Sequence, residues 1–127
     1  MEKTVIRTEA APAPFQGAPY NQAIVAGELV FVAGQLGLAP GDTAVEGDVG
    51  RQTEQALANL AAILEAAGSS MDKLVKTSVF LSDLDDFQGM NEVYASKLGD
   101  RPPARSTFQV AKLPSGALVE IEAVAHL

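Results

Sequence analysis

Residues 48–68 read DVGRQTEQALANLAAILEAAG, and this stretch decides the fold because the hydrophobic pattern changes its period here. Apolar and small side chains recur at steps of three and four, which is the spacing of one face of an α-helix. They are Val49, Thr53, Ala56, Leu57, Leu60, Leu64 and Ala67. Asp48 stands at the N-cap position, and Gly68 supplies the left-handed conformation that commonly ends a helix. The pattern predicts an amphipathic helix with one face against a core.

The segments that flank this helix have the composition of β-strands. Residues 23–33 are rich in large apolar side chains, and the Gly27-Glu28 pair divides them at a turn. Residues 74–81 (LVKTSVFL) are rich in β-branched side chains and are bounded by polar turns. Such segments are typical of strands. A second helix is indicated between residues 87 and 98, because apolar residues recur there at helical spacing.

The last part of the chain contains two further strand-like segments. Residues 105–110 and 118–124 alternate polar and apolar side chains, and Leu113-Pro114-Ser115-Gly116 lies between them. This arrangement predicts a β-hairpin. The order strand, strand, helix, strand, helix, strand, strand predicts a single α+β domain over residues 1–127. In this fold two helices pack on one face of a single mixed β-sheet.

The composition excludes several classes of mechanism. There are no cysteines and one histidine, His126, so disulfides, Cys-ligated metals and a His-pair metal site are excluded within one chain. The net charge of −7 opposes binding to nucleic acid or to an anionic membrane surface. The charged segment 1–14 is unlike a signal peptide, and no apolar run approaches the ~20 residues of a membrane span. We therefore expect a cytoplasmic protein with no metal, nucleic-acid or membrane partner.

In the predicted hairpin, polar side chains of the two strands fall on one face. Side chains two residues apart on a strand share a face, so Arg105, Thr107 and Gln109 point the same way. By the same rule Glu120 and Glu122 share a face, and the predicted register places them opposite Gln109 and Thr107. This polar face is either a solvated or subunit-covered surface with an incidental ion pair, or a site. In a site, the arginine binds a carboxylate and a glutamate holds water.

Several blocks of the sequence resemble successive blocks of the RidA (YjgF-like) family. The C-terminal block is the most specific, because it combines Pro103-Ala104-Arg105-Ser106-Thr107 with Leu113-Pro114 and Val119-Glu120-Ile121-Glu122. The other blocks are Gly17 to Ala23, Phe31 to Gln35, Lys76 to Leu84 and Met90 to Tyr94. The blocks cover nearly the whole chain, which is identified by them as a member of this family.

The resemblance implies a fold, an assembly and an activity. It implies a chorismate-mutase-like α+β subunit that forms a homotrimer, with a central barrel and with sites in the clefts between subunits. Members with the arginine are enamine/imine deaminases that need no cofactor. They hydrolyse 2-aminoacrylate or 2-aminocrotonate, or the imine tautomers 2-iminopropanoate and 2-iminobutanoate, to a 2-keto acid and ammonia. We therefore expect a small imino acid substrate and a role in removing damaging metabolites.

The same resemblance implies roles for individual residues. Arg105 matches the arginine that binds the substrate carboxylate, and Glu120 matches the glutamate associated with the attacking water. These two residues form the predicted catalytic pair. Tyr20 matches a cleft tyrosine, Asn91 a helix asparagine near the pocket, and Gly34 a position where the backbone approaches the ligand.

Two substrate-binding positions depart from the common pattern of the family. Ala33 stands where many members have a serine whose hydroxyl contacts the ligand, so a hydrogen bond of roughly 0.5–1.5 kcal/mol is lost. Thr107 stands where many members have cysteine, and we expect little change because it keeps a small polar side chain.

Two other functions remain open at this point. The first is a trimeric protein that binds a small carboxylate in the same cleft without turnover, which the missing hydroxyl at Ala33 favours. The second is an endoribonuclease, an activity attached to relatives of the family. The net charge of −7 and the lack of a basic cluster rank it last.

Overall fold

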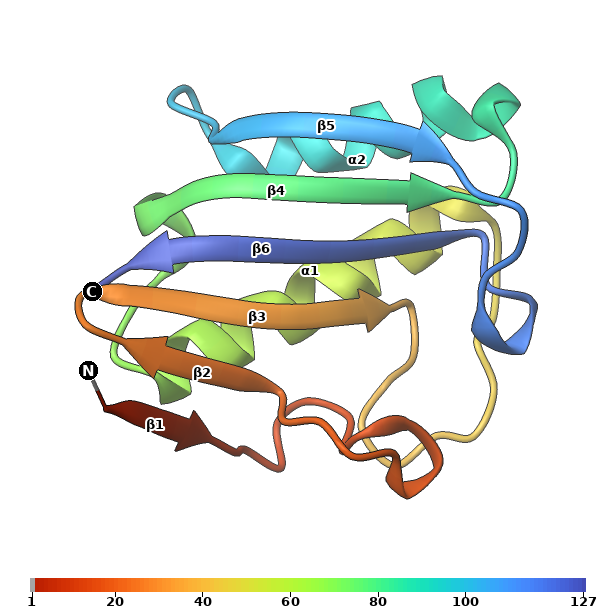
Figure 1. Cartoon of the computed structure of the whole chain (residues 1–127). Helices are drawn as coiled ribbons and strands as arrows, with labels where there is room; N and C mark the ends of the chain where they lie inside the picture. The colour runs from red at the N-terminus through yellow and green to blue at the C-terminus, as the bar shows by residue number, and fades with distance from the viewer. Residues whose placement is uncertain (1) are drawn as a thin grey trace.

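Residues 2–127, the part of the chain that the computed structural model describes, contain one six-stranded sheet in the order β1-β2-β3-β6-β4-β5 (Figure 1). The strands are β1 (Lys3–Ile6), β2 (Ala23–Ala26), β3 (Leu29–Leu36), β4 (Leu74–Leu81), β5 (Ala104–Gln109) and β6 (Val119–His126). The α-helices of these residues are α1 (Val49–Ala66) and α2 (Phe87–Leu98). The predicted fold class, a mixed sheet with two helices, is confirmed. The sequence did not predict β1, a four-residue strand at one edge of the sheet.

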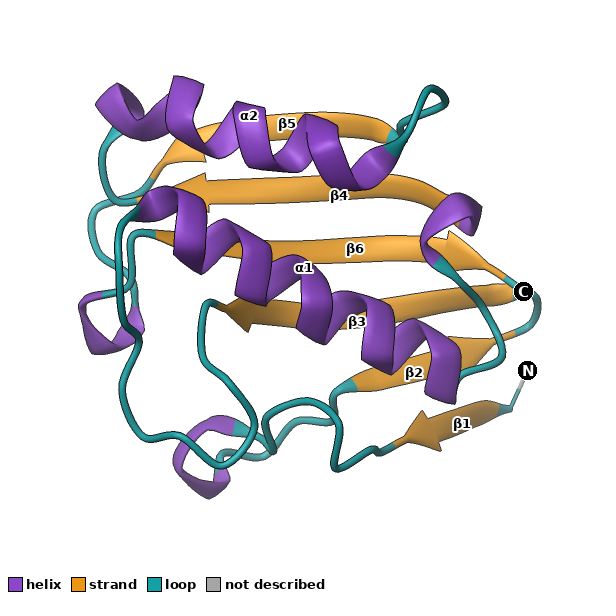
Figure 2. Ribbon diagram, turned by 180° about the vertical axis from the view of Figure 1, so that it is seen from behind, coloured by secondary structure: helices purple, strands orange, loops and turns teal. Residues whose placement is uncertain are grey.

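Both helices lie on the same face of the sheet (Figure 2). Alternate strand residues point toward them and form the core with the apolar sides of the helices. The buried core includes Val30, Val32, Val79, Leu81, Val119 and Ile121 of the strands, Leu57, Leu60, Ile63 and Leu64 of α1, and Met90 and Tyr94 of α2. Neither of the two described helices is long and apolar enough to cross a membrane.

The other face of the sheet, which we call the open face, carries no helix in the described residues (Figure 1). The strand registers place Val5, Leu29, Phe31 and Phe108 on it. Each of these large apolar side chains is at least 40% exposed. They lie on β1, β3 and β5, three strands that are not neighbours in the sheet.

Helix α1 has the ends that the sequence predicts. The Asp48 side chain accepts a hydrogen bond of 2.9 Å from the Arg51 backbone N–H, as an N-cap residue does. At the other end Gly68 has φ +86°, and its N–H donates to the Glu65 carbonyl. The Ser69 N–H donates to the Leu64 carbonyl at 2.8 Å, which completes the Schellman pattern of hydrogen bonds.

The predicted hairpin of the last two strands is wrong. Strand β6 lies between β3 and β4 and is antiparallel to both, whereas β5 pairs with β4 in parallel at the edge of the sheet. The reason is the helix that joins β4 to β5: a strand, a crossover helix and a second strand form a parallel pair. The side chains of β6 that face the helices are all buried and apolar, so a central position with a strand on each side suits β6.

The true register separates the two residues of the predicted catalytic pair. Arg105 lies beside Thr77 of β4, and Thr77 in turn lies beside the buried Ala123 of β6. Arg105 therefore points to the face that the helices cover. Glu120 lies beside Phe80 of β4 and points to the open face. The predicted shared polar face of Arg105, Thr107, Gln109, Glu120 and Glu122 does not exist within one chain.

Candidate active site

Arg105 lies on the edge strand β5, with its guanidinium under helix α2. Its Cζ atom is 4.7 Å from the centre of the Tyr94 ring and 5.6 Å from the centre of the Phe87 ring. Its Nη1 atom is 4.0 Å from the Met90 sulfur. The guanidinium is thus half-buried against two aromatic faces, a contact that favours a cation.

This guanidinium has no carboxylate partner among residues 2–127. The ion pairs of these residues are Arg51 with Glu46 and Lys97 with Glu54, both largely exposed, and neither includes Arg105. Asn91 and Arg105 line the same hollow of about 340 Å³, together with Tyr94, Ala95, Leu98, Gly99, Pro102 and Pro103. A half-buried arginine that opens to a hollow and has no counter-ion is suited to bind a carboxylate from outside the chain.

Thr107 lies two residues further along β5 and points to the same face as Arg105. Its Oγ1 atom is shielded from solvent and has no hydrogen-bond partner among the described residues. The hydroxyl therefore does not face the open side of the sheet, where the hairpin prediction had placed it with Glu120. Its predicted role in substrate binding stays a prediction.

Glu120 and Gly34 lie together on the open face. Strand β3 bulges between Val32 and Gln35, and this bulge brings the backbone of Gly34 against the Glu120 carboxylate. A Cβ atom at position 34 would overlap with the Glu120 carboxylate, so glycine is required for this approach. The predicted role of Gly34, as a position where the backbone approaches the ligand, stays a prediction.

The environment of Glu120 favours its protonated form. Partial burial raises the pKa of the Glu120 carboxyl above its ordinary value of 4.5, and the negative charge of Glu122 raises it further. A carboxyl group with a raised pKa exchanges protons closer to neutral pH, which is what a general acid or base requires.

The loop before β2 lies next to the bulge of β3 that contacts Glu120. Tyr20 and Gly34 line one small hollow of about 30 Å³, and the Tyr20 hydroxyl accepts a hydrogen bond of 2.6 Å from the Phe15 N–H. Ala33 lies in the bulge, where its N–H donates to the Gln22 carbonyl at 2.9 Å. The buried Gln22 amide bonds to Thr8 and to the Ala11 and Pro12 carbonyls, and so fixes the loop.

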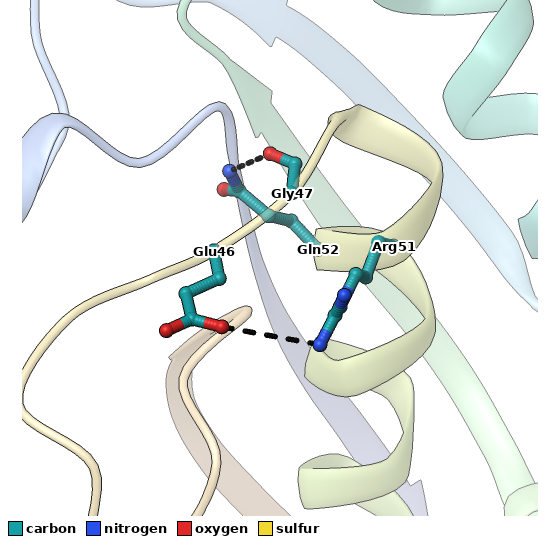
Figure 3. Close-up of polar contacts among 4 residues, drawn as sticks. All are labelled: Glu46, Gly47, Arg51 and Gln52. Carbon is teal, nitrogen blue, oxygen red and sulfur yellow. Dashed lines mark hydrogen bonds and ion pairs between the residues drawn. The ribbon is translucent and has the colours of Figure 1, made fainter.

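Buried amides of α1 hold the strands that carry the glutamate side. The Gln52 side chain donates to the Gly47 carbonyl at 2.9 Å (Figure 3) and accepts from the Leu118 N–H at the start of β6. Asn59 donates to the Leu36 and Leu38 carbonyls at the end of β3. The ion pair of Arg51 with Glu46, also drawn in Figure 3, is exposed on both sides and contributes little.

The predicted site residues thus form two groups. Asn91, Arg105 and Thr107 lie at α2 and β5, and this is the arginine half; Tyr20, Ala33, Gly34 and Glu120 lie at β3, β6 and the loop before β2, and this is the glutamate half. The sequence interpretation gave no role to Tyr94, Phe87 or Thr77, which surround Arg105. The signal for the two aromatic residues was present, because they lie seven positions apart on one helix face, but this spacing is also that of a core.

The fold defines a class of protein, a small α+β subunit with two helices on one face of a mixed sheet, and its candidate arginine and glutamate lie on opposite faces of that sheet. A family model described as Endoribonuclease L-PSP matches residues 8–127. The chain is 48% identical over 129 residues to Reactive Intermediate Deaminase A, chloroplastic, of Arabidopsis thaliana, covering 100% of this chain and 67% of that protein. It is 41% identical over 124 residues to human 2-iminobutanoate/2-iminopropanoate deaminase, covering 97% and 89%.

Solved structures agree with these relationships. RidA from an Antarctic Psychrobacter bacterium has a TM-score of 0.93 at 41% identity, covering 98% of this chain and 99% of that one. TdcF of E. coli with bound serine has a TM-score of 0.90 at 38% identity, covering 98% of both chains. The chain belongs to the RidA (YjgF-like) family, as the blocks around Arg105 and Glu120 indicated.

Proposed function

We propose that this protein is an enamine/imine deaminase that converts 2-iminopropanoate and 2-iminobutanoate to the 2-keto acid and ammonia. The observation that carries the proposal is the Arg105 guanidinium, which opens to a hollow without a carboxylate partner in the described residues. Two relatives over 40% identical are named as deaminases, one of them for these two imines. The serine in the E. coli relative also carries a carboxylate, the group that the guanidinium recognises.

The proposed chemistry needs orientation and proton transfer rather than a strong nucleophile. Arg105 holds the substrate carboxylate, and an enamine first tautomerises to the imine, whose nitrogen takes a proton. Glu120 accepts a proton from water as the water oxygen bonds to the imine carbon. Glu120 then returns this proton to the carbinolamine nitrogen, which leaves as ammonia, while the hydroxyl proton is released to solvent and the C=O bond forms. One imine and one water give one keto acid and one ammonia.

We propose that the site is completed by a second copy of the chain in a homotrimer. Arg105 and Glu120 point to opposite faces of one sheet, so a single subunit does not bring both to one substrate. The open face carries Glu120 next to Phe80, and Phe31 and Phe108 are exposed elsewhere on the same face, which favours burial of this face against another subunit. In this arrangement the arginine half of one subunit meets the glutamate half of the next.

The test is to generate 2-aminoacrylate in situ with a dehydratase and to trap it with semicarbazide. We expect the wild-type protein to divert the intermediate to pyruvate, and the Arg105→Ala variant to lose this effect. Arg51→Ala is the matched control, because Arg51 is an exposed arginine of α1 that pairs with Glu46, and it should keep full activity. Equal protection by wild type and Arg105→Ala would refute the assignment.

Two other outcomes of the same experiment point to other functions. If the protein binds a stable keto acid tightly but turns over no imine, it is a carboxylate-binding protein, a function that the absent hydroxyl at Ala33 favours. The family description Endoribonuclease L-PSP motivates a parallel assay on RNA. Cleavage that survives Arg105→Ala and added salt would identify a nuclease, which the net charge of −7 disfavours.

A further inference from the structure

The surroundings of Arg105 contain a feature that the carboxylate-binding role does not by itself explain. The guanidinium lies under a helix, yet it is stabilised by the rings of Tyr94 and Phe87 rather than by a carboxylate. Tyr94 is only 5% exposed, and its hydroxyl forms a hydrogen bond of 2.7 Å with Thr77 Oγ1, a fully buried group. Thr77 is the β4 residue directly beside Arg105 in the parallel pair. Arg105, Tyr94 and Thr77 thus form one connected unit.

We propose that Tyr94 is the positioning residue for Arg105, with Thr77 fixing the ring and Phe87 supporting the guanidinium from a second side. The proposal rests on the proposed function, in which Arg105 binds the substrate carboxylate. Tyr94 acts through Arg105 and makes no contact with the reacting atoms.

The chemistry of the two groups explains why rings are used. A carboxylate beside Arg105 would satisfy the same N–H donors that the substrate needs and would compete with it. An aromatic ring attracts the positive face of the guanidinium and leaves the N–H groups in its plane free. The rings therefore stabilise the buried cation without occupying its binding edge.

The bond between Tyr94 and Thr77 restricts the ring. Tyr94 comes from α2 and Thr77 from β4, so their hydrogen bond fixes the helix to the strand at the point where Arg105 lies. A guanidinium with a fixed plane loses less conformational freedom when it binds a planar carboxylate. We therefore expect the unit to act on ligand affinity.

The experiment measures pyruvate binding by calorimetry alongside imine turnover, in four variants of the full chain. Tyr94→Leu removes the ring, Phe87→Leu removes the supporting ring, and Tyr94→Phe and Thr77→Val each remove only the hydrogen bond. We expect Tyr94→Leu to weaken pyruvate binding and raise KM by about tenfold with a smaller change in kcat, since a cation–π contact has that worth. Tyr94→Phe keeps the ring and should retain most of the pyruvate affinity that Tyr94→Leu loses. Phe87→Leu and Thr77→Val should each weaken pyruvate binding by about two- to threefold.

Ile63→Val is the matched control, because it shortens a buried side chain of α1, whereas the rings against Arg105 come from α2. It should lower the melting temperature but leave pyruvate affinity unchanged. Phe87 is 41% exposed, so Phe87→Leu reports on the unit even if Tyr94→Leu fails to fold. Wild-type affinity in folded Tyr94→Leu, or in both Phe87→Leu and Thr77→Val, would overturn the proposal. If the wild type binds pyruvate but turns over no imine, the deaminase proposal is refuted and the positioning role of Tyr94 stands.

Discussion

The arginine half and the glutamate half each hold one ionisable group that has no partner of opposite charge within residues 2–127, but their surroundings act on the charge in opposite ways. Aromatic rings surround Arg105 and stabilise its charged form. Partial burial and the neighbouring Glu122 act against the charged form of Glu120 and raise its pKa. The charge of arginine is permanent in any surroundings, whereas the raised pKa of Glu120 brings its proton exchange closer to neutral pH.

This difference shows how the work of a small subunit is divided between two surfaces. In the proposed mechanism, Arg105 of β5 supplies the fixed charge that recognises the substrate carboxylate. Glu120 of β6 supplies the group whose raised pKa suits proton transfer. The sheet separates the two residues, so this mechanism requires subunit assembly.

The largest effect is expected when the substitutions of Arg105 and Glu120 are placed in different subunits. Arg105→Ala and Glu120→Ala should each lose about two to three orders of magnitude in activity, the range for removing one partner of a desolvated charged contact. When the two inactive proteins are unfolded, mixed in equal amounts and reassembled, activity should return to about a quarter of wild type, because one interface in four pairs an intact Arg105 with an intact Glu120.

The control for reassembly is the wild-type protein carried through the same unfolding. A mixture that stays as inactive as its parents, beside a fully recovered wild type, would show that both residues act within one chain.

A smaller effect is expected from Gly34→Ala, which disturbs only the glutamate half. The added methyl group overlaps with the Glu120 carboxylate, which must swing aside. We expect kcat to fall by about 10- to 100-fold, since a shift of about 1 Å has such an effect on a positioned group. Gly50→Ala is the control: it adds a methyl group in α1 with contacts of 3.4 Å and longer, and it should leave activity unchanged. Full activity of Gly34→Ala would mean that the carboxylate need not lie against position 34.

The smallest effect is on the pH dependence of stability. The pKa of Glu120 is raised in the folded protein. Its favourable contribution to folding stability is therefore fully present below the unfolded-state pKa near 4.5 and is lost as pH rises through the folded-state pKa. Glu120→Gln should therefore raise the melting temperature slightly at pH 7 and have no such benefit at pH 4. Thermal melts of both proteins across this range provide the check, and a variant less stable than wild type at pH 7 would contradict the assigned cause.

Local signals in the sequence predicted the helices well, because their determinants are local. Asp48, Gly68 and the apolar stripe of α1 each act within a few residues of their own position. The hairpin prediction failed because strand pairing depends on distant segments, and two alternating strands give no local sign that β6 inserts between β3 and β4.

The candidate site shows the same difference between local signals and distant strand pairing. The blocks of sequence identified Arg105, Glu120 and Gly34 as individual residues, whereas the side of the sheet that each occupies depends on the register of β4 with its two neighbours. Tyr94 was hidden for another reason. A buried aromatic residue on a helix face has the same pattern whether it fills a core or supports a cation, and only the position of Arg105 beside it distinguishes the two.

The central position of β6 has a consequence for how the molecule folds. The last strand of the sequence joins two otherwise separate parts of the sheet, β1-β2-β3 on one side and β4-β5 on the other. Most pairings of β6 with β3 connect residues about 90 positions apart, and such distant contacts close slowly. Until β6 is in place, the inner edges of β3 and β4 are unpaired and open to association with other chains. We therefore expect closure of the sheet to be a late step, and substitutions in β6 that slow it to increase aggregation during refolding before they change the stability of the finished fold.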